Sequence, residues 1–432
     1  MTHSFRKKFF GAFVILFALA GTILIFYVQG YRVDVSSFSV KKTGAVYIES
    51  TPNDIEIFLN QKSYKDKSSI LQKGTLITNI LPKKYYLFLK KDGYFDYNKN
   101  ITVDQSTVVR LLNIVFVPKE IVPKNIEADF KGTKIIQTSQ NQDIIIQDQS
   151  KNILYLYRKS NLTKPINLTT TISGFFKQKF QDISFYPQED NKFILTTSKG
   201  LYVADIDKKT SSLLQDGIIY FNAVDKNNLY SVAERSIKTT TLVNKKSVTK
   251  TIATSTLEII DLSLAQKAGT IVTPFDSTDI IDFGNSSSRY FYLLKNGSLY
   301  IQDKSSNQFT LIAQKAVSAS FSPNENKILF QDQDGKIFVF LFEDDIVNFD
   351  MKKGEQLKLN IPDVTKIKNI TWYKDSYHIV FQYPQKLYIA EITKTEPNNN
   401  FKISDKVTDP YYNKKNSTWY YLNEGKITYI EI

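Results

Sequence analysis

The chain has 432 residues, 42% hydrophobic and 23% charged, so it is long enough for two or three domains and is neither disordered nor collagen-like. It contains no cysteine and only two histidines, which excludes disulfides and thiolate sites and leaves little material for a zinc site or a His-based triad. The formal net charge is +13, but only six of the 56 basic residues are arginines and the lysines are scattered, so we expect a solvated surface and no nucleic-acid partner.

The first predicted element is an uncharged hydrophobic segment of 23 residues, 9–31. As a helix it would be about 34 Å long, enough to cross a bilayer core of roughly 30 Å, so we predict a single transmembrane helix with the lipid bilayer as its partner. Three basic residues lie in the preceding tail, 1–8, and the next basic residue is Arg32. This asymmetry predicts a cytoplasmic tail and an extracytoplasmic position for the rest of a single-pass cell-membrane protein.

A cleaved signal peptide is the alternative interpretation of this segment. Ala18, Leu19 and Ala20 form an A-x-A site, after which a signal peptidase would cut. The hydrophobic stretch continues through residues 22–28, past the cleavage position, which favours an uncleaved anchor. Both interpretations export the remainder of the chain.

Short alternating strands replace the helical period after the anchor. Residues 32–42 are predicted to be a linker, and residues 43–117 a small β domain. Its strands are expected at residues 44–50, 55–60, 85–90, 100–103 and 106–117. Proline and Asn/Asp in the segment 51–54 predict a turn between the first two strands.

A series of short motifs is spaced along this β domain. They are Gly44-Ala45-Val46, Ser50-Thr51-Pro52, Asn60-Gln61-Lys62, Leu81-Pro82-Lys83 and Lys91-Asp92-Gly93-Tyr94. In this order they resemble the PEGA domain, a small all-β module of bacterial envelope and surface proteins. The region departs from the family in two places, where Pro52-Asn53-Asp54-Ile55 stands for Pro-Glu-Gly-Ala and Lys83 for a glycine. The resemblance covers roughly 75 residues, and it implies a β-sandwich without catalytic residues that acts as a spacer or interaction module.

The remaining residues, 118–432, have no convincing helix and contain a repeating unit of short strands and polar turns. Pairs of aromatic residues mark the unit, 17 residues apart in four copies and 16 in one. These pairs are Phe185 and Tyr202, Phe283 and Tyr300, Phe321 and Phe338, Tyr412 and Tyr429, and Trp372 and Tyr388. Seven units are expected to start near residues 137, 185, 221, 283, 321, 372 and 412.

Units of about 40–50 residues with four short strands are typical of propeller blades. Lys199-Gly200, Asn296-Gly297 and Asp334-Gly335 predict tight hairpins in three units. The repeat resembles WD40-like and TolB-type propellers, although Trp-Asp and Gly-His pairs are missing. We therefore expect an all-β ectodomain, a PEGA-like sandwich followed by a propeller of about seven blades, with residues 126–130 completing the blade that contains 426–432. Six blades, or an array of two-sheet sandwiches, are the alternatives.

The sequence contains no recognisable catalytic, cofactor or metal-binding motif, so no such site residues and no cofactor are predicted. His378 lies in a predicted strand, where an edge or partly buried position is expected and not a catalytic role. The segment 332–335 lacks the acids of an EF-hand, since Phe330 and Leu341 occupy two of their positions, and a hairpin turn is expected instead. The acidic segment 343–345 is expected to be a solvated loop between blades.

Asn161, Asn369 and Asn416 each begin an Asn-x-Ser/Thr triplet, which chance explains in a chain so rich in these residues. Tyrosines at strand ends are expected to pack between blades or to line a groove for carbohydrate or peptide.

The leading hypothesis is a non-enzymatic envelope protein that presents its propeller to a protein or a surface polymer. The alternatives are a propeller hydrolase or lyase acting on a peptide or polysaccharide, and an intracellular scaffold of inverted topology, which the basic tail disfavours.

Overall fold

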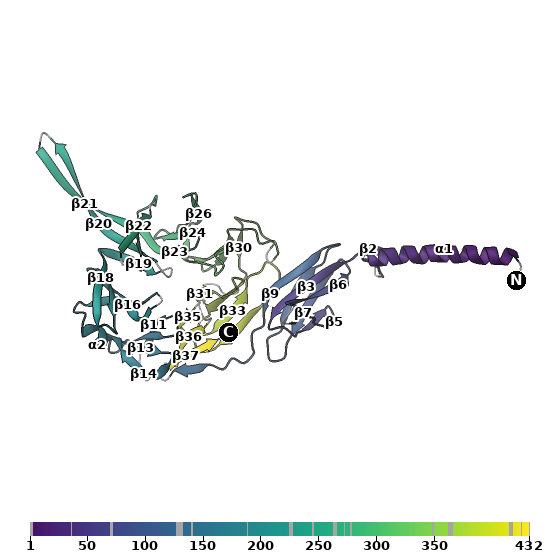
Figure 1. Ribbon diagram of the computed structural model, residues 1–432, viewed down its shortest axis with the longest axis horizontal. Coiled ribbons are helices and arrows are strands. Elements are labelled where there is room, and N and C mark those ends of the chain that lie inside the picture. The colour runs from purple at the N-terminus through teal and green to yellow at the C-terminus, as the bar shows by residue number, and fades with distance from the viewer. Residues whose placement is uncertain are drawn as a thin grey trace. The chain divides into compact units, whose positions relative to one another are not determined.

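The structure is a computed structural model (Figure 1). It describes residues 3–35, 37–69, 72–126, 133–139, 141–187, 189–223, 228–243, 246–261, 266–271, 273–276, 279–347, 350–361, 366–413, 418–424 and 426–431. Within these ranges the chain forms two α-helices and 37 β-strands. The expectation of a mostly β chain with one N-terminal apolar helix is therefore confirmed.

The chain divides into two compact units, and two late segments of the chain belong to the first of them. Unit 1 consists of Met1–Glu120, Asp345–Met351 and Glu391–Phe401, and unit 2 of Ile121–Asp344, Lys352–Ala390 and Lys402–Ile432.

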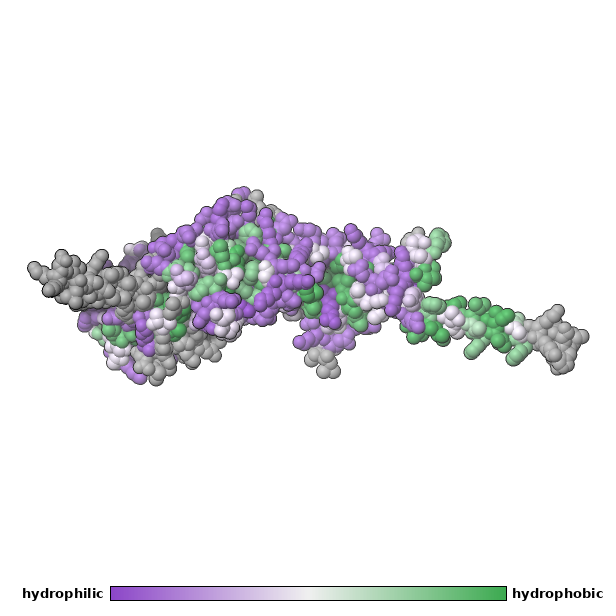
Figure 2. All heavy atoms as spheres, turned by 90° about the horizontal axis from the view of Figure 1, so that it is seen from above, coloured by the Kyte–Doolittle hydropathy of each residue, from purple (hydrophilic) through white to green (hydrophobic). Residues whose placement is uncertain are grey.

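Unit 1 begins with the long helix α1 (His3–Val28). Its stretch Phe9–Val28 has a mean hydropathy of 2.6 and no part of it is buried, so the helix is long and apolar enough to cross a membrane. Figure 2 shows it as an almost continuous hydrophobic surface. The helix ends three residues before the predicted end, because Gly30 adopts a φ of 86° and Tyr31 already belongs to a strand.

A β-hairpin occupies the predicted linker. It consists of β1 (Tyr31–Asp34) and β2 (Ser39–Lys42), which pair antiparallel. The backbone N–H and the hydroxyl of Thr43 both donate to the carbonyl of Gly30, at 2.9 and 2.8 Å. These bonds fix the end of α1 to the start of the following β module.

Two small sheets form the rest of this module. One has the order β6-β3-β9, with β3 (Gly44–Thr51), β6 (Gly74–Ile80) and β9 (Val108–Val115). The other has the order β5-β4-β7-β8, with β4 (Glu56–Leu59), β5 (Lys62–Tyr64), β7 (Lys84–Lys90) and β8 (Tyr97–Thr102). All five predicted strands are present, and β5 and β6 are additional.

Alternating side chains of both sheets form a single core. Val46 and Ile48 of β3 are buried, and so are Leu87 and Leu89 of β7. Since successive side chains of a strand point to opposite faces, this period of two places one face of each sheet in the core. Each buried aliphatic side chain contributes about 1.5–3 kcal/mol to folding.

Seven antiparallel sheets of four strands make up the repeat region. Its first part contains β10 (Lys124–Ile126), β11 (Thr133–Thr138), β12 (Ile144–Asp148), β13 (Ile153–Arg158), β14 (Asn161–Asn167), α2 (Leu168–Ser173), β15 (Phe180–Tyr186), β16 (Glu189–Thr197), β17 (Gly200–Asp205), β18 (Thr210–Asp216), β19 (Ile218–Ala223), β20 (Asn228–Val243), β21 (Lys246–Asp261) and β22 (Gln266–Ile271). The short helix α2 corrects the expectation of a region without helices.

The second part continues the same pattern. It contains β23 (Ile280–Asn285), β24 (Arg289–Leu294), β25 (Leu299–Asp303), β26 (Phe309–Ala313), β27 (Ala316–Phe321), β28 (Lys327–Asp332), β29 (Ile337–Leu341), β30 (Gln356–Lys358), β31 (Lys368–Trp372), β32 (His378–Gln382), β33 (Leu387–Glu391), β34 (Asn400–Ser404), β35 (Thr408–Asn413), β36 (Thr418–Asn423) and β37 (Lys426–Glu431). Six sheets use four strands in chain order, and the last has the order β10-β37-β36-β35.

The repeat read from the sequence coincides with these sheets. Six of the seven predicted starts lie in the first strand of a sheet and the seventh in β35. Four aromatic pairs span the first and third strands of a sheet, and the fifth spans β35 and β37 of the last sheet. The three predicted glycine turns join second and third strands, where Gly200, Gly297 and Gly335 have φ values of 145°, 84° and 80°. Backbone of this kind favours glycine because it lacks a Cβ.

Additional elements explain the unequal intervals between units. The longest interval contains β20 and β21, which are 16 residues each and extend as a ribbon beyond their neighbours (Figure 1). Another contains α2, and a third contains the loop between β29 and β30. The acidic segment 343–345 lies in this last loop and therefore connects two strands of one sheet. The expectation that it connects two repeat units is wrong.

Apolar clusters and hydrogen bonds join each sheet to the next. Three clusters combine residues of neighbouring sheets between β15 and β30, and a further one joins the β11–β14 and β15–β18 sheets. The indole N–H of Trp372 on β31 donates to the carbonyl of Ser320 on β27 at 2.9 Å. The hydroxyls of Ser404 on β34 and Tyr421 on β36 lie 2.8 Å apart.

The last sheet packs against the first. One cluster contains Ile135 and Tyr157 of the β11–β14 sheet together with Tyr420 and Ile427 of the last. The latter sheet is completed by β10, whose Ile126 pairs with Ile427. The predicted closing segment began at Ile126, and its residues 127–130 lie outside the described residues.

Candidate functional site

The candidate site is a pocket of about 610 Å³ in unit 2, lined by residues of the β19–β22 and β23–β26 sheets and their loops. Its apolar lining consists of Ile259, Ile271, Pro274, Tyr290 and Phe309. The volume lies within the range of small-molecule sites, roughly 300–1,000 Å³. The pocket is therefore large enough for a small ligand or a segment of a larger one.

Aromatic rings support the apolar side of the pocket. The ring of Phe275 lies 5.2 Å from that of Tyr292, 5.2 Å from that of Tyr300 and 5.6 Å from that of Phe309, measured between centroids. Such contacts hold rings in fixed orientations, because aromatic pairs prefer tilted and edge-to-face arrangements. Phe309 and the rings packed behind it thus form an aromatic base of the pocket.

Amide groups with fixed orientations form part of the polar lining. The hydroxyl of Tyr292 donates to Oε1 of Gln302 at 2.5 Å, and Nε2 of Gln302 donates to Oδ1 of Asn307 at 3.3 Å. Thr270 and Thr273 add two hydroxyl groups to the lining. These side chains offer hydrogen-bond donors and acceptors beside the aromatic surface.

Lys304 brings a positive charge to the same lining. Its ammonium group donates to Oδ1 of Asn285 and to the carbonyl of Ser286, each at 2.6 Å, and lies 4.4 Å from the ring centroid of Tyr290. Cations bind the faces of aromatic rings through the ring quadrupole. Among the described residues no carboxylate lines the pocket.

His378, the histidine singled out in the sequence, is buried at the start of β32 and lies outside the pocket. Its Nδ1 is 2.6 Å from Oδ2 of Asp375, whose other oxygen accepts the backbone N–H groups of Tyr377 and His378. Burial acts to raise the pKa of Asp375, but His378 and these hydrogen bonds outweigh it and lower the pKa. The pair stabilises the turn that precedes β32. His378 lies in a strand as predicted, but it is buried where an edge or partly buried position was expected.

The other sequence candidates also occupy structural positions. Asp332 and Asp334 flank the hairpin turn at Gly335, where the carboxylate of Asp332 accepts the N–H of Lys336 at 2.8 Å. Asn161 begins β14, and Asn369 on β31 donates to Gln382 at 2.8 Å, while Asn416 lies outside the described residues. The described residues contain no group of three or more potential metal ligands.

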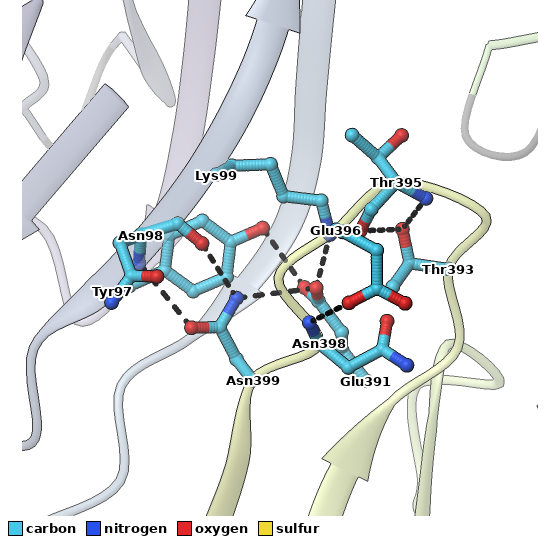
Figure 3. Close-up of polar contacts among 9 residues, drawn as sticks. All are labelled: Tyr97, Asn98, Lys99, Glu391, Thr393, Thr395, Glu396, Asn398 and Asn399. Carbon is cyan, nitrogen blue, oxygen red and sulfur yellow. Dashed lines mark hydrogen bonds and ion pairs between the residues drawn. The ribbon is translucent and has the colours of Figure 1, made fainter. Parts of the chain in front are cut away.

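A buried polar cluster in unit 1 was not foreseen from the sequence (Figure 3). The carboxylate of Glu391 accepts hydrogen bonds from the ammonium group of Lys99, from the hydroxyl of Tyr97 at 2.8 Å and from Nδ2 of Asn399 at 3.2 Å. The amide of Asn399 also exchanges two hydrogen bonds with the backbone of Asn98, at 3.0 and 3.2 Å. The cluster fixes the segment Glu391–Phe401 to β8.

The ionisable groups of this cluster are shielded from water. The side chain of Lys99 is 5% exposed and that of Glu391 10%. Burial lowers the pKa of Lys99 despite the attraction of Glu391, and burial raises the pKa of Tyr97 well above its usual value. We interpret the cluster as a structural junction, because both carboxylate oxygens of Glu391 accept hydrogen bonds from side chains of the protein itself.

Comparisons with family models and with curated proteins find no match to this chain. The pocket therefore has to be judged by its own residues. Tyrosines at strand ends were expected to line a groove, and Tyr290, the second residue of β24, lines this pocket. Lys304, Gln302 and Asn307 carried no recognisable motif.

Proposed function

We propose that the chain is a membrane-anchored binding protein of the cell envelope. The observation that carries this proposal is α1, whose 20-residue apolar stretch is entirely exposed. Exposed apolar surface of this extent is stable only in contact with lipid or another apolar partner. The tail 1–8 would be cytoplasmic and the rest of the chain extracytoplasmic, as the positions of the basic residues favour.

The seven four-stranded sheets are proposed to be the blades of a β-propeller. Two observations support this interpretation: each sheet packs on the next, and the last packs on the first. In addition, the N-terminal β10 pairs with the C-terminal β37, which would close a ring by combining both ends of the repeat region in one blade. The β3–β9 module is proposed to be a PEGA-like spacer between membrane and propeller.

The pocket between the third and fourth blades is proposed to bind a segment of a hydroxyl-rich surface polymer. Its aromatic base, fixed amides and hydroxyl groups suit the apolar faces and hydroxyls of sugar rings. Lys304 would favour a polymer that also carries negative charge. A hydrolase or lyase would instead need converging carboxylates, which the described lining does not contain.

Retention of soluble envelope polysaccharides by the immobilised full-length protein tests this proposal. We expect Tyr290→Ala and Lys304→Ala each to weaken binding about tenfold, equivalent to about 1.4 kcal/mol. Tyr86→Ala, at an exposed tyrosine of unit 1, is the matched control and should bind as the wild type does. Retention of envelope proteins but no polysaccharide, or equal binding by all variants, would contradict the proposed ligand.

A further inference from the structure

The hairpin β1–β2 exposes an apolar surface directly after α1. Val33 and Val40 are 64% and 62% exposed and pair across the hairpin, so they lie on the same face. In the loop, Val35 is 73% exposed and Phe38 90%. Four large apolar side chains are therefore in contact with solvent within a segment of eight residues.

Arg32 and Asp34 of β1 lie on the opposite face of the hairpin, where both make polar contacts. Lys42, which pairs with Tyr31, lies on the face of Val33 and Val40. Asp34 is buried and accepts hydrogen bonds from Ser37 and Lys41, both at 2.8 Å. Arg32 donates to Oδ1 of Asn79 on β6 at 2.8 Å. This arrangement reverses the usual one, in which the apolar face of an antiparallel pair faces the core and the polar face faces water.

The backbone at Phe38 adds an independent observation. Phe38 has a φ of 49°, in the left-handed region that bulky residues rarely adopt and that favours glycine or asparagine. A phenylalanine here is unfavourable for the turn, and with 90% of its surface exposed it gains little from packing within the protein. Strained residues of this kind occur where a function requires the side chain.

The hairpin is attached to the end of α1. The guanidinium group of Arg32 lies 3.7 Å from the ring centroid of Tyr27, and the rings of Phe26 and Tyr31 are 5.3 Å apart. A chain whose helix spans a bilayer through Val28 must therefore place this hairpin at the membrane surface. Both attachments lie within unit 1.

We propose that the β1–β2 hairpin is a membrane-binding element, whose face of Val33 and Val40 and whose loop residues Val35 and Phe38 insert into the boundary between lipid headgroups and acyl chains. The inference rests on the proposed membrane anchoring by α1 and deepens it. Apolar side chains at this boundary are removed from water, whereas flanking basic groups remain near lipid phosphates. The hairpin would thus restrict the rotation and tilt of the β module on the membrane.

Fluorescence quenching of the full-length protein in phosphatidylcholine vesicles tests the proposal. The wild-type tryptophans, Trp372 and Trp419, are buried in unit 2 and provide a constant background. With lipids brominated near the carbonyl end of the acyl chains, we expect the added emission of Phe38→Trp to fall about twofold. The added emission of Tyr86→Trp, at an exposed position on β7, should not be quenched. Adding Val33→Ser and Val40→Ser to Phe38→Trp should reduce the quenching of its emission.

The outcomes separate the hairpin from the anchor. Flotation of the protein with the vesicles without quenching of Phe38→Trp would overturn the inference and leave the anchor intact. A blue-shifted but unquenched emission would also overturn it, because a second protein chain would then cover the hairpin. Loss of flotation would contradict the anchoring by α1 itself.

Phe38→Asn provides a second measurement that does not depend on a reporter. Asparagine suits the positive φ, so a purely structural hairpin should exchange its amide hydrogens at the same rate or more slowly in this variant. If lipid contact holds the hairpin, amides of β1 and β2 should instead exchange several-fold faster in vesicles. Equal or slower exchange in vesicles would overturn the proposal.

Discussion

At the scale of single residues, Lys99 and Glu391 form a buried ion pair in unit 1. Lys99→Met would leave a buried carboxylate with two neutral hydrogen-bond donors, Tyr97 and Asn399. Removing one partner of a buried pair costs about 3–5 kcal/mol. We expect amide exchange in β8 to accelerate accordingly in this variant.

The double variant Lys99→Met with Glu391→Gln distinguishes the lost charge balance from lost packing. The oxygen of the neutral amide can accept from Asn399 and its NH2 group can donate to the hydroxyl oxygen of Tyr97, so most of the lost protection in β8 should return. Protection that stays as low as in Lys99→Met would mean that the carboxylate charge is not the cause. A single variant Lys99→Met with wild-type protection would show that the junction contributes nothing to stability.

Asp66 provides a pH-dependent contribution to the same module. Burial acts to raise its pKa, but hydrogen bonds from Ser68, Thr75 and the N–H of Ile55 outweigh it and lower the pKa to about 2. Because the native pKa lies below the unfolded value of 3.8, this stabilisation is complete above about pH 4 and is lost as the pH falls toward 2. Since the side chain is partly exposed to solvent, we expect about 1 kcal/mol after solvent screening.

Amide exchange of the β3–β9 module at pH 5 and pH 2.5 measures this effect. The wild type should lose local stability over this interval, and Asp66→Asn should lose less, because it lacks the titrating group. An identical pH dependence in both proteins would rule out Asp66 as the source.

At the scale of elements, strand β10 connects the two ends of the repeat region. Ile126 on β10 is 2% exposed and packs in the cluster shared by the first and last sheets. Ile126→Ala should lower the free energy of unfolding of the repeat region by about 2–5 kcal/mol, because it removes buried methyl groups and leaves a cavity.

Thermal unfolding in detergent checks this prediction. Val122→Ala, four residues earlier at a side chain that is 82% exposed, is the matched control and should unfold like the wild type. Equal unfolding temperatures for Ile126→Ala and Val122→Ala would mean that β10 does not help to hold the last sheet together.

Element by element, the sequence predicted the structure best where side-chain periodicity was strong. The five aromatic pairs located five of the seven sheets, because two strands of each of these units place aromatic residues at a nearly constant separation. Helix α2 was missed, since its Leu168–Ser173 segment is rich in threonine, whose branched side chain disfavours helices. The β1–β2 hairpin was missed because its short strands carry their apolar residues on the outer face.

At the scale of the whole molecule, the features not predicted depend on contacts between distant residues. Lys99 and Glu391 are 292 residues apart in the chain, and no local pattern identifies such a pair. The pocket similarly combines Ile259 of one sheet with Phe309 of the next. The lining of the pocket depends on which side chains of different strands lie opposite one another. The periodicity of a single strand cannot predict this, because it contains no information on the neighbouring strands.

At this scale, α1 is proposed to anchor the chain in the membrane and the β-rich domains to lie on its extracytoplasmic side. A C-terminally tagged full-length protein, expressed in cells that are then treated with external protease and extracted with alkaline carbonate, tests it most directly. We expect the tagged domains to be digested from outside, and the untreated protein to stay in the carbonate-resistant membrane fraction. A full-length protein that is released by carbonate and protected from the protease in the cytosol would contradict the account.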